Sequence, residues 1–174
     1  MKRYVIGKDE QGRSTVVKDD TSPLRTWGWS AGVEGAPHNQ TRTLGVERTV
    51  PAPAGGGWTA ELWASIQNDG VVDQLDPFEA FAGMEAGINS LEVPAGTARF
   101  SVTTYGPGYR SRLHSTDSID FDICIAGELT LGLENGEVHL TPGDVAIVPG
   151  SMHYWTTEHG GAMAYVMLSP HAVK

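Results

Sequence analysis

Two histidines and two aspartates in the second half of the chain are the residues best suited to chemistry. His114 precedes Asp120 and Asp122, and His153 follows further along the chain. Imidazole and carboxylate groups bind divalent metals, and they also donate and accept protons near neutral pH. These four residues are therefore the candidate catalytic residues, either around a metal or in a metal-free acid–base site.

The candidate residues lie within two spaced motifs. The first motif consists of Gly108, His114, Thr116, Asp120 and Gly127. The second motif consists of Gly143, Asp144, Pro149, Gly150 and His153. Together they resemble the paired motifs of the cupin superfamily, in which a glycine and two histidines precede an acidic or amide residue and a glycine, and a third histidine follows a Gly-Asp start and a Pro/Gly turn. The resemblance covers roughly residues 97–168 and implies an all-β fold, the double-stranded β-helix or jelly-roll barrel.

The resemblance also implies a ligand set for a metal. His114, Asp120 and His153 match three metal-binding positions of the family. The chain departs from the family at Thr116, where a second histidine is usual, and at Thr157, where many members have asparagine. Two histidines and one carboxylate remain a valid ligand set for iron, manganese, nickel or zinc. The alternative is a barrel without a metal, in which these residues bond one another and a ligand; no organic cofactor is expected.

Strand geometry explains how residues so far apart in the chain can meet. Side chains alternate along a strand, so His114 and Thr116 share one face. Asp120 then joins them from the next strand, and His153 enters from a strand of the second hairpin pair. Such groups can converge inside a small barrel, whose mouth is a natural site for a small molecule.

The same alternation assigns a side to Asp122. If Asp120 points inward, Asp122 and Cys124 do so too, with Cys124 as a small buried hydrophobic residue. The outward residues, packed against a neighbouring sheet, are then Phe121, Ile123 and Ile125. Two carboxylates on one interior wall raise the pKa of at least one of them, and a carboxyl that keeps its proton can act as a general acid. In the alternative, a bulge or strand end turns Asp122 to solvent.

Residues around the motifs are candidates for substrate contact. Arg110 and Arg112 share the parity of His114, and a guanidinium at the mouth would suit a carboxylate, phenolate or enolate; the alternative is that both are solvated or paired with surface acids. Tyr105, Trp155 and Met163 would line an apolar pocket for an aromatic or polyketide-like ring, or else form plain core. The predicted substrate-binding residues are Arg110, Arg112, Tyr105, Thr116 and Trp155.

Strands are the elements expected to position these residues. Gly and Pro are abundant, and no long stretch has apolar residues at helical spacing, which favours an all-β sandwich or barrel. The predicted strands are residues 2–8, 14–18, 24–29, 58–66, 97–105, 119–125, 128–133, 137–140, 144–148, 153–157 and 162–168. A short helix is expected over 76–84, a two-residue turn at Asn135-Gly136, and a covering or mobile loop over 30–57.

Length and composition restrict the class of protein. The 174 residues suit a single domain, with an N-terminal hairpin extension and loop over 1–57 and a barrel core over 97–168. A net charge of −9 argues against nucleic acid or an anionic membrane as the partner. The single cysteine excludes an internal disulfide framework. No apolar run of membrane-spanning length occurs, so a cytoplasmic protein is expected, and the resemblance implies a homodimer.

Together these features predict an enzyme that acts on a small carbonyl, phenolic or polyketide-like compound. The expected reaction is that of a lyase (dehydratase or decarboxylase) or an isomerase. His114, Asp120 and His153 would act with or without a divalent metal, and Asp122 would move the proton. The alternatives are a metal-dependent dioxygenase and a non-catalytic barrel that binds a small molecule, because a fold alone does not decide function.

Overall fold

The computed structural model describes residues 2–20, 25–29, 42–44, 52–68, 71–73, 93 and 95–169. Every regular element in these ranges is a strand, which confirms the predicted all-β class. None of the described residues belongs to a helix of the length and apolarity that crossing a membrane requires. The predicted helix over 76–84 lies outside the described residues.

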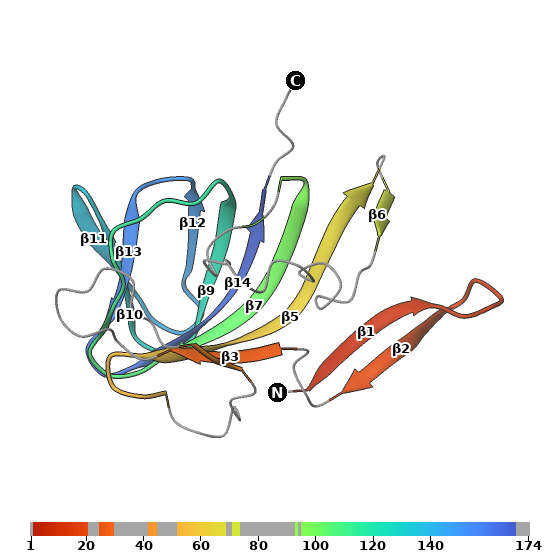
Figure 1. Ribbon diagram of the computed structural model, residues 1–174, viewed down its shortest axis with the longest axis horizontal. Helices are drawn as coiled ribbons and strands as arrows, with labels where there is room; N and C mark the ends of the chain where they lie inside the picture. The colour runs from red at the N-terminus through yellow and green to blue at the C-terminus, as the bar shows by residue number, and fades with distance from the viewer. Residues whose placement is uncertain are drawn as a thin grey trace.

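Two sheets form the body of the molecule (Figure 1). The larger one contains β3 (Arg25–Trp29), β4 (Arg42–Leu44), β5 (Gly57–Asn68), β6 (Val71–Asp73), β7 (Thr97–Tyr105), β9 (Ile119–Gly127), β12 (Val145–Pro149) and β14 (Gly161–Leu168). Its strand order is β12-β9-β14-β7-β5-β3-β4, with β6 paired to β5. The smaller sheet contains β8 (Tyr109–Arg110), β10 (Leu129–Leu133), β11 (Gly136–Leu140) and β13 (His153–Thr157), in the order β11-β10-β13-β8. Neighbouring strands that are distant in sequence, such as β14 between β9 and β7, give the jelly-roll arrangement.

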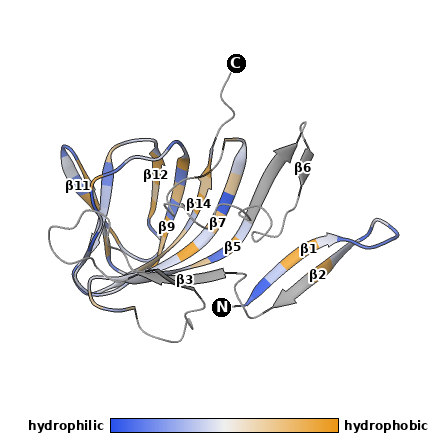
Figure 2. Cartoon of the chain, viewed as in Figure 1, coloured by the Kyte–Doolittle hydropathy of each residue, from blue (hydrophilic) through white to orange (hydrophobic). Residues whose placement is uncertain are grey.

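The barrel core lies between the inner faces of the two sheets. Its buried apolar side chains come from both of them: Tyr105, Cys124, Val148 and Met163 from the larger sheet, and Tyr109, Leu129, Leu131, Leu140 and Trp155 from the smaller one. Hydrophobic and hydrophilic residues alternate along these strands, as Figure 2 shows, because successive side chains point to opposite faces. The packing of one inner face on the other therefore closes the barrel.

The outer face of β9 differs from the prediction. Asp120, Asp122 and Cys124 are buried, as strand alternation predicted. The residues between them, predicted to pack against a neighbouring sheet, are instead exposed: Phe121 by 39%, Ile123 by 42% and Ile125 by 45%. The reason is that β9 lies in one layer between β12 and β14, and the smaller sheet packs on the inner face of that layer only.

Most strand predictions are confirmed, and two connections are corrected. The hairpin loop between β10 and β11 is Glu134–Asn135, one residue earlier than predicted, because Leu133 pairs with Gly136. Gly136 is therefore the first residue of β11, where its φ is positive, at 110°. The segment 30–57, predicted as a loop, contains the short strand β4, which pairs with β3. Most of its other residues lie outside the described part of the chain.

Gly127, which closes the first motif, is required by close packing. Its φ is +66°, and a Cβ at this position would collide with the carbonyl oxygen of Gly160. Gly127 pairs with Gly161 where β9 meets β14. The motif glycine therefore allows two backbones to approach closely at one end of the barrel.

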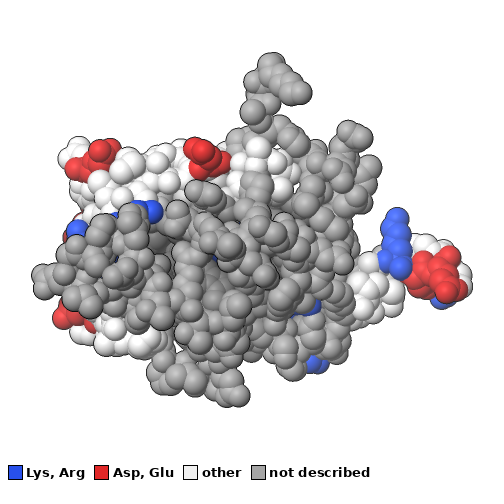
Figure 3. All heavy atoms as spheres, in the orientation of Figure 1, with Lys and Arg blue, Asp and Glu red and all other residues white. Residues whose placement is uncertain are grey.

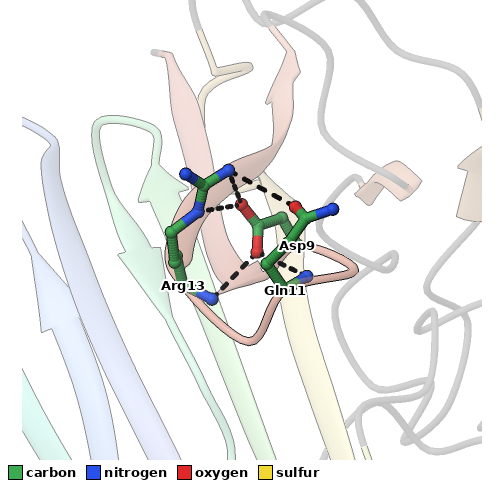
Figure 4. A network of polar contacts seen from close by, with 3 residues as sticks. All are labelled: Asp9, Gln11 and Arg13. Atoms are coloured by element: carbon green, nitrogen blue, oxygen red, sulfur yellow. Dashed lines mark hydrogen bonds and ion pairs between the residues drawn. The ribbon is translucent and has the colours of Figure 1, made fainter.

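The N-terminal hairpin lies beside the barrel (Figure 1). It consists of β1 (Arg3–Lys8) and β2 (Ser14–Asp20), as predicted, and Arg3 Nη1 ties it to the barrel by donating to the carbonyl oxygen of Leu62 at 2.9 Å. Acidic and basic side chains gather at its far end (Figure 3). There Asp9 accepts from the backbone N–H of Gln11 and Arg13 and from the Arg13 guanidinium (Figure 4). The homodimer stays a prediction.

Candidate functional site

His114 and His153, the histidines of the two motifs, lie side by side on paired strand segments. They form an antiparallel bridge outside the regular strands. Each backbone N–H donates to the carbonyl oxygen of the other residue, at 2.9 Å and 2.8 Å. Their imidazole rings are 4.5 Å apart between centroids, at an angle of 50°. The backbone thus brings together two side chains that belong to separate motifs.

Both imidazoles are oriented through Nδ1. The ring of His114 bonds the carbonyl oxygen of Arg112 at 2.9 Å, and that of His153 bonds the carbonyl oxygen of Ser151 at 2.8 Å. A carbonyl oxygen only accepts, so each Nδ1 carries the hydrogen. In the neutral ring, Nε2 is then the acceptor. Burial lowers the pKa of His114, and the neighbouring His153 lowers it further, although the bond to Arg112 opposes this. His114 is therefore held in the neutral form that can accept a proton.

Asp120 is fixed by two hydroxyl groups. Ser118 Oγ donates to Oδ1 at 2.5 Å, and Thr116 Oγ1 donates to Oδ2 at 3.3 Å. Burial raises the pKa of Asp120, whereas these hydrogen bonds and the charges of His153 and Arg99 oppose the rise. Thr116, which stands where the family usually has histidine, thus holds a carboxylate in this chain.

Asp122 is the most perturbed carboxyl group of the site. Its side chain is only 3% exposed, so the predicted inward orientation is confirmed and the solvent-facing alternative is wrong. Burial raises the pKa of Asp122 to about 8, and repulsion from Asp120 contributes. Asp122 therefore keeps its proton at neutral pH, which suits a general acid.

The three predicted metal ligands do not form a metal cage. Within the described part of the chain, no group of three or more His, Cys, Asp or Glu side chains is placed so that it could hold a metal ion. His114 and His153 lie together, but both oxygens of Asp120 are engaged by hydroxyls. A carboxylate oxygen that accepts one hydrogen bond keeps a lone pair for a metal, so the ligand set that the resemblance implies stays a prediction.

The predicted aromatic residues lie inside the barrel. Tyr105 is buried and stacks on Tyr109, with ring centroids 4.6 Å apart. Burial raises the pKa of Tyr105 well above its usual value and that of Tyr109 to about 12. Trp155 presents an edge contact to the ring of His153, with centroids 6.3 Å apart, and Met163 is buried beside these aromatic rings. All four side chains belong to the barrel core.

The two predicted arginines lie on the outside. Both side chains are exposed. The guanidinium of Arg110 lies 4.0 Å from the centroid of the Tyr154 ring. Arg112 takes part through its backbone, because its carbonyl oxygen orients His114. A role for either guanidinium in substrate binding stays a prediction.

Polar residues that the sequence analysis missed continue the site across the larger sheet. Arg99, 1% exposed, forms an ion pair with Glu61 at 2.8 Å and donates to Ser101 at 3.2 Å. Two residues further along the same face, Thr59 of β5 and Thr103 of β7 share a hydrogen bond of 2.7 Å. A signal was present: Arg99, Ser101 and Thr103 are polar at alternate positions of β7, which places them on one face.

Comparisons with known proteins support the fold. No protein-family model matches the chain. A cupin-domain-containing oxidoreductase of Aspergillus ruber is 24% identical over 172 residues, which is 95% of this chain and 71% of that protein. Another of that description, from Neurospora crassa, is 34% identical over 83 residues, 45% of this chain and 42% of that protein. The phomopsin biosynthesis cluster protein C′ of Diaporthe leptostromiformis is 33% identical over 95 residues, which is 52% of this chain.

The chain spans about half the length of the phomopsin-cluster protein, 48%. The cupin-domain proteins add to what the fold and the motifs already indicate. Because the two motifs meet inside a jelly-roll barrel and named cupin proteins align with the chain, the chain has the fold of the cupin superfamily and is similar to its members.

Proposed function

We propose that the protein is an enzyme that moves protons on a small enolisable carbonyl or phenolic compound, as a lyase or an isomerase. The observation that carries this proposal is Asp122, a buried carboxyl group that keeps its proton at neutral pH. Asp122 faces the same interior as His153, which is itself buried. An acid, Asp122 on the larger sheet, and a base, His153 on the smaller sheet, are thus available in the interior between the two sheets, each in its own environment.

The base is an imidazole Nε2, since Nδ1 of each ring already donates to a carbonyl oxygen. Nε2 removes a proton from the carbon next to the substrate carbonyl, while Asp122 gives its proton to the carbonyl oxygen, so that a neutral enol forms. In a dehydration, the C=C bond forms as the C–O bond at the next carbon breaks. The imidazolium returns its proton to the departing hydroxide, giving water, and Asp122 recovers its own when the enol collapses. In an isomerisation, the proton returns to another carbon instead.

Aromatic side chains in the barrel support the choice of substrate class. Tyr105, Tyr109 and Trp155 are buried together with Met163, an environment that favours a planar, apolar ring over a sugar. The name of the phomopsin-cluster relative is consistent with a role in the biosynthesis of a small organic compound.

Replacement of His153 by glutamine tests the base. Glutamine retains polarity and approximate size but cannot take up the proton, so kcat is expected to fall about 100-fold. The measurement is incorporation of deuterium from D2O into small enolisable ketones, followed by NMR. His139→Gln, which alters an exposed histidine of β11, is the matched control and should behave as wild type. Undiminished exchange in His153→Gln would contradict the proposed function.

A second candidate, a metal-dependent oxidoreductase, is favoured by two observations. Two relatives are named oxidoreductases, and the Nε2 atoms of the paired imidazoles are both open acceptors. A metal analysis of protein purified without a histidine tag separates the candidates. Under the proposed function, metal stays well below one equivalent, and EDTA changes neither the melting temperature nor the exchange rate. One equivalent of iron, manganese, nickel or zinc, lost in His114→Gln, would instead establish the oxidoreductase candidate.

A further inference from the structure

Tyr165, which belongs to neither motif, lies next to Asp122 on the inner face of the larger sheet. It is the direct cross-strand partner of Asp122 on one side and of Ser101 on the other. The ring is half-buried and packs against the barrel core. The strands concerned, β9, β14 and β7, run side by side in Figure 1. Two groups that can donate hydrogen bonds therefore stand on adjacent strands and face the same interior.

A chain of hydroxyl groups orients Tyr165. Thr59 and Thr103 share a hydrogen bond of 2.7 Å, and Thr103 Oγ1 donates to the Tyr165 hydroxyl oxygen across a long contact of 3.5 Å. Either hydroxyl can be the donor between Thr59 and Thr103; when Thr103 donates to Tyr165, Thr59 donates to Thr103. Both threonines are buried, at 1% and 3% exposure. The hydrogen-bonded hydroxyl groups thus run from Thr59 on β5 through Thr103 on β7 to Tyr165 on β14.

The proton of Tyr165 itself is left for another acceptor. Its oxygen accepts from Thr103, and no acceptor for its O–H is recorded among the described residues. Two further tyrosines lie close by, since Tyr165 and Asp122 both influence the pKa of Tyr105, and Tyr165 that of Tyr109. None of these groups carries a positive charge. Tyr105, Tyr109 and Tyr165 thus supply neutral hydroxyl groups to the interior near Asp122.

We propose that the Tyr165 hydroxyl is a second hydrogen-bond donor, beside Asp122, to the oxygen of an enolisable ketone or phenol. This inference rests on the proposed function and extends it to the substrate oxygen. Tyr165 stabilises the oxygen as negative charge develops on it and keeps its own proton. Donors fixed in a site that excludes water act strongly on such charge, and loss of one typically lowers kcat about 100-fold or more. Thr59 and Thr103 are positioning residues, because they act through Tyr165.

Binding of substituted phenols tests the inference without any need for turnover. A series of nitro- and halophenols of increasing acidity imitates the enolate oxygen, and the absorbance of the bound phenol shows how far it is ionised. Wild-type protein is expected to bind the more acidic phenols more tightly. In Tyr165→Phe, affinity should fall at least 10-fold and the dependence on phenol acidity should flatten. Thr103→Val should reproduce part of the loss, whereas Thr103→Ser, which restores the hydroxyl, should bind as wild type does.

Tyr154→Phe is the matched control, because Tyr154 is also a half-buried tyrosine but alternates along β13 with the buried residues His153, Trp155 and Thr157. It should leave phenol affinity and the ionisation of the bound phenol unchanged. Folding of each variant is verified by its melting curve, and substitution of Tyr by Phe keeps the packing of the ring. Wild-type affinity and slope in Tyr165→Phe, or failure of the wild-type protein to bind any phenol of the series, would overturn the inference.

The experiment separates this inference from the proposed function. Phenol binding that depends on Tyr165, without deuterium exchange into ketones, would support Tyr165 as a donor and overturn the enzymatic function in favour of a binding barrel. Exchange that depends on His153 but is unaffected in Tyr165→Phe would support the enzymatic function and overturn the role of Tyr165.

Discussion

Replacement of Asp122 by asparagine is expected to lower kcat about 1000-fold and, at neutral and alkaline pH, to raise the melting temperature. The first effect follows because asparagine keeps the size and hydrogen-bonding capacity of the carboxyl but cannot transfer its proton. The second follows because Asp122 is buried beside Asp120, which destabilises the folded state at neutral and alkaline pH. There the carboxyl either holds a proton that it would release in water or carries a charge that burial and Asp120 disfavour. Residues that activity requires often lower the stability of the folded protein, so that their replacement stabilises it.

The pH dependence of stability has a definite sign. The folded-state pKa of Asp122, about 8, lies above the value of 3.8 for an unperturbed aspartate. Below pH 4 both the folded and unfolded states carry the proton, so Asp122 costs nothing there. Between these two pKa values unfolding releases a proton, and the free energy of unfolding falls by about 1.4 kcal/mol for each pH unit from this group. The stability gain of Asp122→Asn should therefore grow as pH rises from 4 to 8 and then level off.

Melting temperatures measured in parallel across that pH range check this result, together with kcat as a function of pH. Wild-type kcat should decline as pH rises through about 8, where Asp122 loses its proton. Asp117→Asn is the matched control, since Asp117 is an exposed aspartate of the same segment. A difference in stability between Asp122→Asn and wild type that did not vary with pH would show that Asp122 is ionised in the folded protein.

The inward placement of Asp122 was predictable because it depends only on the alternation of side chains along one strand. Once Asp120 is assigned to the interior, the side of Asp122 follows, and the burial along β9 agrees. The approximate extent of most strands was predictable for a similar reason, since local sequence determines where turns fall.

Contacts that depend on pairing between distant strands were not predictable from one sequence. Whether His114 stands opposite His153 depends on register, and a shift of one residue would move a ring to the other face. The hydroxyls that bond both oxygens of Asp120 also escaped prediction. Tyr165 was missed because its partners, Asp122 and Thr103, lie on two other strands.

Replacement of Arg99 by leucine is expected to destabilise the protein by about 3–5 kcal/mol, because it leaves the Glu61 carboxylate buried without its ion-pair partner. The ion pair lies inside the barrel, where Arg99 is 1% and Glu61 8% exposed in their side chains. A charge removed from water is tolerated only when another charge and hydrogen bonds compensate it. Urea unfolding followed by tryptophan fluorescence gives the free energy directly.

A second variant separates the loss of a partner from the loss of packing. In Arg99→Met combined with Glu61→Leu, both charges are gone, so most of the stability should return, as it does where apolar residues replace a buried ion pair. Arg13→Leu removes the exposed ion pair with Asp9 on the hairpin and should leave the unfolding midpoint almost unchanged. If the double variant were as unstable as Arg99→Leu, the pair would contribute through its shape and its bond to Ser101 rather than through compensation of charge. Arg99 also lowers the pKa of Asp120. In that case the ion pair would serve to position the residues around Asp120, rather than only to stabilise the core.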